Sequence, residues 1–308
     1  MPKEDDLSTR TITGSQTQLL ALIAALATGG VAYRLIVQHH LEQTSLLFIG
    51  LPSLLAVILV LAPPARSLPG GVLRGITLFL LLSGPVLGEG FVCVLMAAPI
   101  FLAVGLIVAL LIQASKRRDE RRTALSCCLL VLILPMSLEG TTGTLSFNRF
   151  ERVSQSALVA GTPADVQARM AQSPRLDLKL PPYLRMGFPH PTSAIGAGLS
   201  PGDLRRIHFE GGEGKPGDLV FRVAASTPTS ARFVVESDGC EGMHSIGHWV
   251  TLREADVSWT PIDAHHTRVT WQLAYERRLD PAWYFGPWER YAGRLAARYL
   301  IDANAGPR

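Results

Sequence analysis

Long apolar runs fill the first half of this 308-residue chain, and no other feature limits its fold as strongly. A helix that crosses the hydrocarbon core of a bilayer needs about 20 predominantly apolar residues. Several runs approach that length; they cover residues 19–37, 46–62, 72–88, 91–113 and 123–138. We therefore expect an all-α transmembrane region of about five helices over residues 1–145.

Glu89 lies between the third and fourth runs, in the sequence Gly88-Glu89-Gly90. We interpret this break as the meeting point of two helices. An ionisable residue at membrane depth is a functional hypothesis by default, so Glu89 is a candidate membrane-embedded acid. The alternative is a wet residue at the outer tip of a helical hairpin, with no chemical role.

The basic residues beside these runs predict the orientation, because cytoplasmic loops of membrane proteins carry the excess of Lys and Arg. With five spans and a cytoplasmic N-terminus, every basic residue of this half except Arg34 falls on the inner side, including the KRRDERR segment at residues 116–122. The second half then faces the periplasm or the exterior of a bacterial inner or plasma membrane. The side reverses if the chain crosses four times.

Residues 146–308 have the composition of a soluble domain, since they hold 19 of the 29 Lys and Arg residues and 17 of the 25 Asp and Glu residues. The formal charge of +4 divides evenly between the two halves. Neither half has the strong basic excess of a nucleic-acid-binding protein, so we expect no nucleic-acid partner.

Apolar periodicity and capping residues predict the elements of this domain. Strands are expected at residues 150–160, 205–210, 219–224, 231–237, 249–262 and 268–277. A short helix is expected to begin at Thr162-Pro163 and to end at about Ala171, and a Pro-rich irregular stretch follows over residues 174–191. Asp280-Pro281 marks the start of a long final helix.

The last strand and the last helix each present one apolar face. A curved antiparallel sheet that packs around one long helix leaves a space between them, and such a space is a natural cavity for an apolar ligand. The side chains on these two faces are therefore candidate ligand-binding residues, and plain core packing is their alternative role. The candidates are Trp271, Leu273, Tyr275, Tyr284, Trp288 and Tyr291.

The element order and the segment VTWQLAYERRLDPAWYFGPWERYAGRLAARYLID resemble the SRPBCC (START-like, helix-grip) superfamily, in its polyketide cyclase and lipid-transport branch, over residues 148–304. The resemblance implies an α+β helix-grip domain, in which a six- or seven-stranded sheet grips the final helix around a pocket for lipids, sterols or polyketides. The superfamily has no universal catalytic motif. The multispan region departs from its usual soluble members and favours a ligand near the bilayer.

Two residue groups were weighed for metal or acid–base chemistry. Cys240, His244 and His248 are residue types that ligate zinc, but their spacing is not one of the usual zinc patterns, so we predict no metal and no cofactor. Glu254 and Asp256 lie two apart in a strand and face the same side, where the polar alternation indicates solvent. The catalytic residues are unknown, and the balance is against an enzyme.

The leading hypothesis is a membrane-anchored domain that binds or transfers a hydrophobic ligand, above all a lipid. One alternative is a cyclase- or hydratase-like enzyme, which needs buried acids or histidines such as Glu254 or His208 to point into the cavity. The other is a non-catalytic regulatory module with a protein partner, which predicts a collapsed cavity and an exposed apolar patch.

Overall fold

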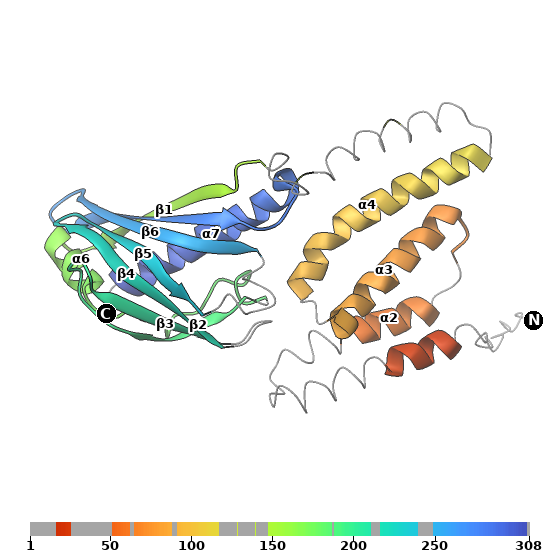
Figure 1. Ribbon diagram of the computed structural model, residues 1–308, viewed down its shortest axis with the longest axis horizontal. Helices are drawn as coiled ribbons and strands as arrows, with labels where there is room; N and C mark the ends of the chain where they lie inside the picture. Colours follow the sequence, from red (N-terminus) through yellow and green to blue (C-terminus); the bar gives the residue numbers. More distant parts are fainter. Residues whose placement is uncertain are drawn as a thin grey trace, which may run out of the picture. The chain divides into compact units, whose positions relative to one another are not determined.

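The computed structural model describes residues 17–25, 51–61, 65–87, 91–116, 147–186, 188–210, 216–239 and 249–306, together with Cys128 and Glu139. The chain divides into two compact units, Met1–Val131 and Leu132–Arg308. Each unit is described by itself (Figure 1). The expected domain boundary at residue 145 stays a prediction.

The described part of the N-terminal unit is helical. Besides a helical turn region at residues 17–25, it contains α2 (Leu51–Leu61), α3 (Leu68–Leu87) and α4 (Phe91–Lys116). Helix α3 packs against both α2 and α4. Gly105 of α4 allows a close approach to α3, because a Cβ atom at this position would lie 2.0 Å from Cδ1 of Ile76.

Among the described helices, one is long and apolar enough to cross a membrane, and it covers Val94–Ala114 within α4. The apolar segment Leu68–Ser83 of α3 is shorter than that criterion requires. A transmembrane region of five helices is therefore not confirmed. Most of the first and last predicted spans, and the candidate acid Glu89, lie outside the described residues.

The C-terminal unit is an antiparallel sheet of seven strands with two helices. The strands are β1 (Phe150–Ala160), β2 (His190–Ile195), β3 (Leu204–Glu210), β4 (Gly217–Thr227), β5 (Ser230–Asp238), β6 (Val250–Pro261) and β7 (His266–Arg277). Helix α6 covers Pro163–Met170, and helix α7 covers Ala282–Ala305. The strand order is β1-β7-β6-β5-β4-β3-β2. The sheet curls around α7 (Figure 1), so the predicted α+β helix-grip architecture is confirmed for this unit.

Local sequence signals account for several of these elements. The side chain of Thr162 accepts a hydrogen bond from the Asp165 amide, and the Asp165 carboxylate accepts one from the Thr162 amide, so a capping box begins α6 as predicted. In β7, Val269, Trp271 and Leu273 are buried at every second position, as the alternation predicted.

A bulge keeps both halves of β6 turned toward the core. The register of β6 against β7 shifts between Leu252 and Glu254. Because side chains alternate between the two faces of a strand, one extra residue reverses the alternation. Val250 and Leu252 therefore face inward before the bulge, and Ala255 and its alternate neighbours face inward after it.

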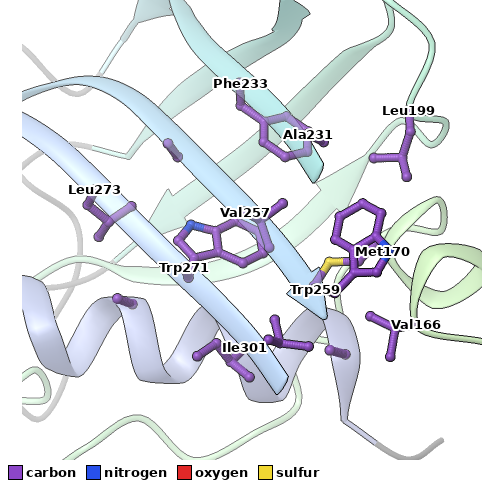
Figure 2. Close-up of a cluster of buried hydrophobic side chains, with 14 of the residues drawn as sticks. Val166, Met170, Leu199, Ala231, Phe233, Val257, Trp259, Trp271, Leu273 and Ile301 are labelled. Carbon is purple, nitrogen blue, oxygen red and sulfur yellow. The ribbon is translucent and has the colours of Figure 1, made fainter. Parts of the chain in front are cut away.

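The main core lies where strands β5, β6 and β7 meet α6 and α7. Figure 2 shows this cluster, with apolar side chains from all five elements packed together. The labelled members are Val166, Met170, Leu199, Ala231, Phe233, Val257, Trp259, Trp271, Leu273 and Ile301. Trp259 is fully buried, and its indole nitrogen donates a hydrogen bond to the Pro228 carbonyl at 2.9 Å. The indole is thus both packed and satisfied.

A strand that the sequence did not indicate begins at the end of the stretch expected to be irregular. Strand β2 includes Pro191 and pairs with β3 alone. Proline cannot donate to a ladder, but an edge strand has one side that needs no partner. The edge position of β2 explains why a Pro-rich stretch still joins the sheet.

Candidate functional site

A cavity of about 300 Å³ lies between the concave face of the sheet and helix α7. Most of its lining is apolar and comes from strands β3 to β7, from α7 and from the segment at residues 174–191. The polar exceptions are Arg205, Asp238, Tyr275, Glu289, Tyr299 and Asn304. A concave space with mostly apolar walls and a few polar groups is the usual form of a small-molecule site.

One face of α7 forms the floor of the cavity. The lining residues recur at helical spacing, from Glu289 through Ala292, Gly293 and Ala296 to Asn304. At 1.5 Å per residue this stripe is about 22 Å long. Its middle positions carry small side chains, so the helix leaves room above them. The cavity is therefore elongated along the helix.

Helix α7 lies against one side of the curled sheet, where it packs on β1 and β7. Gly293 permits this close packing, because a Cβ atom there would lie 2.8 Å from Cγ2 of Val153 on β1. The strands that curl over the other side of the helix contribute Ile207, Phe221 and Phe233 to the cavity wall. Because the helix packs on β1 and β7 only, the space between it and β3, β4 and β5 stays open.

The irregular segment before β2 covers the cavity with aromatic contacts. The ring of Tyr183 lies 5.2 Å from that of Tyr291 and 5.5 Å from that of Phe188, measured between centroids. Phe188 in turn packs edge-on against Trp249 at 5.2 Å. Burial raises the pKa of Tyr183 to about 12. These aromatic rings thus cover one side of the cavity.

Three of the six candidate ligand-binding residues line the cavity, namely Trp271, Leu273 and Tyr275, all on β7. The other three, Tyr284, Trp288 and Tyr291, are absent from its lining. The side chain of Tyr291 is 51% exposed and holds Tyr183 instead. Consecutive helix positions point about 100° apart. The face that meets the cavity begins at Glu289, one position beyond the predicted aromatic stripe at Trp288.

Buried polar atoms in the cavity wall lack hydrogen-bond partners among the described residues. They are Nε of Arg205, the indole nitrogen of Trp271, the hydroxyl oxygen of Tyr275 and both carboxylate oxygens of Glu289. These four residues are 3–5% exposed. Buried polar groups in proteins are nearly always paired, so such atoms need an explanation. Glu289 was not among the predicted site residues, because the side of α7 that faces inward is set by how the helix packs and not by residue type.

The surroundings of Glu289 favour the protonated form of its carboxyl group. Burial raises its pKa to about 8, and the charge of Glu151 adds to this effect. The charges of Arg277 and Arg290 and the nearby backbone of Leu279 oppose the shift without cancelling it. A neutral carboxyl group can both donate and accept a hydrogen bond. Burial also raises the pKa of Tyr275, which stays a neutral hydroxyl.

Arg205 lies at the other end of the cavity and is held by main-chain oxygens. It donates hydrogen bonds to the carbonyls of Met170 and Gly198, the latter at 2.8 Å. Its guanidinium carbon lies 5.1 Å from the ring centroid of Phe233. Burial lowers its pKa to about 10, so it remains a cation at neutral pH. The two ends of the cavity therefore differ in charge.

A buried ionic cluster lies where β7 leads into α7. Arg277 is fully buried and pairs with Asp280 at 2.6 Å and with Glu139 at 3.4 Å. Both carboxylate oxygens of Glu139 also accept from the amide of Ala282 at 3.1 Å. Helix α7 has no cap from its own N-cap residue, Pro281. A carboxylate more than a hundred residues earlier in the sequence therefore caps this helix.

The residues weighed for catalysis lie away from the cavity. On the outer face, Glu254 of β6 pairs with Arg152 of β1 at 3.0 Å, across the intervening strand β7, and Asp256 pairs with Arg232 of the neighbouring strand β5 at 2.7 Å. His208 pairs with Asp218 at 2.5 Å, which raises the pKa of the imidazole. None of these residues is part of the cavity lining. The condition that the enzyme alternative requires, with Glu254 or His208 pointing into the cavity, is therefore not met.

The zinc candidates Cys240, His244 and His248 lie outside the described residues. Within the part of the chain that the structure describes, no three His, Cys, Asp or Glu side chains are grouped so that they could hold a metal ion.

No family model and no curated protein matches the chain. Solved structures similar to its C-terminal half include TTHA0849 from Thermus thermophilus, with a TM-score of 0.33 and 16% identity over 50% of this chain and 94% of that one. A START superfamily protein from Mycobacterium smegmatis matches with a TM-score of 0.32 and 15% identity over 49% and 92%. The Zhui aromatase/cyclase from a Streptomyces species matches with a TM-score of 0.29 and 14% identity over 50% and 86%. The neighbours thus include START-like proteins, and the sheet topology described above defines the fold without them.

Proposed function

We propose that this chain is a membrane-anchored binding protein for a hydrophobic ligand, a lipid above all, which occupies the cavity between the sheet and α7. The observation that carries the proposal is the cavity itself, about 300 Å³ of space with mostly apolar walls. Protein interiors are otherwise close-packed, and an unfilled apolar space costs stability. A ligand with an extended apolar tail would fill this space and remove that cost.

Membrane anchoring is supported by the surface of α4. Large apolar side chains are exposed along it, among them Leu95, Phe101 and Leu110, at 41–48%. Contiguous apolar surface of this kind is rare on proteins surrounded by water. The segment Val94–Ala114 also has the length and composition of a membrane span. An anchor of this kind would keep the binding unit at the bilayer, where lipid is abundant.

The two alternative functions find less support in the cavity. A cyclase- or hydratase-like enzyme was expected to use Glu254 or His208 there, and both side chains form ion pairs elsewhere. A regulatory module was expected to have a collapsed cavity, whereas this one is open.

Extraction of lipid from the purified full-length chain, with identification by mass spectrometry, tests the binding function. Ala296 lies on the cavity floor, so Ala296→Phe fills the space, whereas Ala225→Phe places the same group on an exposed position of β4. We expect a lipid of defined mass with the parent chain and with Ala225→Phe, and its loss with Ala296→Phe. Lipid bound around the helices is common to all three proteins and cancels in this comparison. Identical lipid from both variants would disprove binding in the cavity.

A C-terminal alkaline-phosphatase fusion tests the anchor and its predicted orientation. The phosphatase is active only outside the cytoplasm. With five spans, we expect an active fusion that stays in the membrane pellet after alkaline carbonate washing. An inactive fusion in the pellet would indicate an even number of spans, and a fusion released by carbonate would disprove the anchor.

A further inference from the structure

The polar groups in the cavity wall are placed to hold one more polar group. Tyr275 on β7 and Glu289 on α7 both line the cavity. Neither the Tyr275 hydroxyl nor the Glu289 carboxylate has a hydrogen-bond partner among the described residues, and each residue is 3% exposed. The indole nitrogen of Trp271 on the same strand is a further donor without a partner there.

The charged neighbours of Glu289 are already engaged with other groups. Arg277 pairs with Glu139 and Asp280, and Arg290 pairs with Glu151 at 3.0 Å. The carboxyl group of Glu289 is therefore not one half of an internal ion pair. Together with Tyr275, these are the charged and titratable groups that influence it.

We propose that the cavity selects an apolar molecule with a neutral hydroxyl or carbonyl group, which hydrogen-bonds to Tyr275 and Glu289 while its tail lies along α7 toward Asn304. This inference rests on the proposed function and adds the chemical class of the ligand. A ligand hydroxyl can accept from the Tyr275 hydroxyl and donate to the Glu289 carboxyl, and a ligand carbonyl can accept from both. The raised pKa of Glu289 supports a neutral partner, because a protonated carboxyl group neither attracts a cation nor repels a neutral oxygen.

Other head groups fit the cavity less well. A carboxylate head would be drawn to the cationic Arg205 at the far end of the cavity, and it would meet unfavourable charge whenever Glu289 ionises. An alkyl ammonium head would require Glu289 to lose its proton in a buried site. A plain alkane would leave the polar atoms of the wall unpaired.

Quenching of tryptophan fluorescence by bromine-labelled chains can measure this selectivity in the full-length protein. All the tryptophans of the chain lie between residues 249 and 288, and Trp249 and Trp271 line the cavity. We would use the full-length chain in phosphatidylcholine nanodiscs and titrate bromododecane, ω-bromododecanol, ω-bromododecanoate and ω-bromododecylamine. Affinities are expressed relative to the amount of each probe in the bilayer, so that partitioning does not bias the comparison.

We expect ω-bromododecanol to bind at least about tenfold more tightly than bromododecane. Tyr275→Phe and Glu289→Leu should each reduce that preference, and the double variant should abolish it while still binding bromododecane. Glu289→Gln keeps a donor and an acceptor, so it should retain the preference. The matched control is Glu254→Leu, which makes the same change as Glu289→Leu outside the cavity lining.

The outcomes separate the inference from the proposed function. Saturable quenching of equal strength by the alcohol and the alkane would overturn the inference and leave the proposed function intact. Absence of saturable quenching by every probe would overturn the proposed function itself. Tightest binding of the amine would make Glu289 a counter-ion, and tightest binding of the carboxylate would place the head at Arg205; either result overturns the neutral head group. A double variant with an unchanged tryptophan melting curve but an undiminished preference would also overturn it.

Discussion

Helix α4 and strand β7 are both rich in apolar residues, but the two units place these residues against opposite surroundings. On α4, Leu95 and Phe101 are 47% and 48% exposed, whereas on β7 Val269 and Trp271 are 0% and 4% exposed. The first unit surrounds itself with an apolar surface, and the second encloses an apolar space. The comparison shows that apolar content alone does not decide a location, because its periodicity decides whether a segment shows one apolar face or several.

In both units a glycine lets a helix pack closely against the neighbouring helix or strand. Gly105 lies against Ile76 of α3, and Gly293 lies against Val153 of β1. The neighbours differ in stiffness. Cδ1 of Ile76 is the end of a flexible side chain, whereas Cγ2 of Val153 belongs to a β-branched residue with few rotamers. The same substitution is therefore expected to cost more at Gly293.

The distribution of tryptophan makes the comparison measurable in the intact chain. Every tryptophan lies in the C-terminal unit, so intrinsic fluorescence during urea unfolding reports the free energy of unfolding of that unit. The four predictions below use this signal and are ordered from the largest expected effect to the smallest.

Arg277→Met removes the fully buried cation of the C-terminal unit, a kind of group that the described helices of the other unit do not bury. The variant leaves the carboxylates of Glu139 and Asp280 without their buried partner. We expect a loss of about 3–5 kcal/mol in the free energy of unfolding. The control is Arg298→Met, whose pair with Asp302 is half exposed and is expected to matter by less than about 0.5 kcal/mol. Equal effects of the two variants would contradict the claim that the buried ion pairs of Arg277 stabilise this unit.

Gly293→Ala and Gly105→Ala test the two glycines directly. The added methyl group at Gly293 meets Val153 and should lower the free energy of unfolding by about 1–3 kcal/mol. Gly105→Ala should leave the tryptophan signal unchanged, because its contact lies in the other unit. A clear effect of Gly105→Ala on the tryptophan signal would show that the two units unfold together. The tryptophan signal would then not report on the C-terminal unit alone.

Glu289→Gln tests the buried acid through pH. The pKa of Glu289 is about 8 in the folded chain, against an ordinary value of 4.5. Between these values the folded chain retains a proton that the unfolded chain releases. The free energy of unfolding should therefore fall as pH rises, by up to about 1.4 kcal/mol per pH unit, and level off above the folded-state pKa.

The glutamine variant should lack this part of the slope, so its advantage over the parent should grow from acidic to alkaline pH. Glu254→Gln provides the control, since Glu254 lies in an ion pair on the outer face. Parallel pH profiles for the parent and Glu289→Gln would rule out the raised pKa.

Thr162→Ala tests a purely local signal and should have the smallest effect. The substitution removes the side-chain oxygen that accepts from the Asp165 amide at the start of α6. We expect a loss of about 1 kcal/mol. Thr260→Ala, at an exposed position of β6, should change the free energy of unfolding by no more than about 0.5 kcal/mol. A larger effect at Thr260 than at Thr162 would contradict the claim that the Thr162 cap stabilises α6.

The sequence predicted the elements whose determinants are local. The first strand, the capped helix at Thr162 and the alternating strand at Val269 follow from residues close together in the chain. Strand β2 was missed because its partner β3 and its edge position, which tolerates Pro191, are set by the tertiary fold. The resemblance to helix-grip proteins supplied the sheet around the final helix, and the topology confirms it.

Of the candidate ligand-binding residues, those on β7 line the cavity and those on α7 do not. The alternation of β7 placed Trp271, Leu273 and Tyr275 on the inner face without ambiguity. A helix face, by contrast, is fixed by how the helix packs, and here Gly293 against Val153 sets that rotation. The rotation brings Glu289 inward, and a buried acid cannot be recognised from residue type alone. Whether Tyr284, Trp288 and Tyr291 contact a ligand stays a prediction.

The cap that Glu139 provides to α7 joins two distant points of the chain. Every strand of the sheet lies between Glu139 and Ala282 in the sequence, so their contact closes a loop that contains the whole sheet. Glu139 also follows directly after the last apolar run, at residues 123–138. A fragment that began at residue 146 would lack Glu139. The Ala282 amide of α7 would then lose its carboxylate cap, and the buried Arg277 would lose one of its two ion-pair partners.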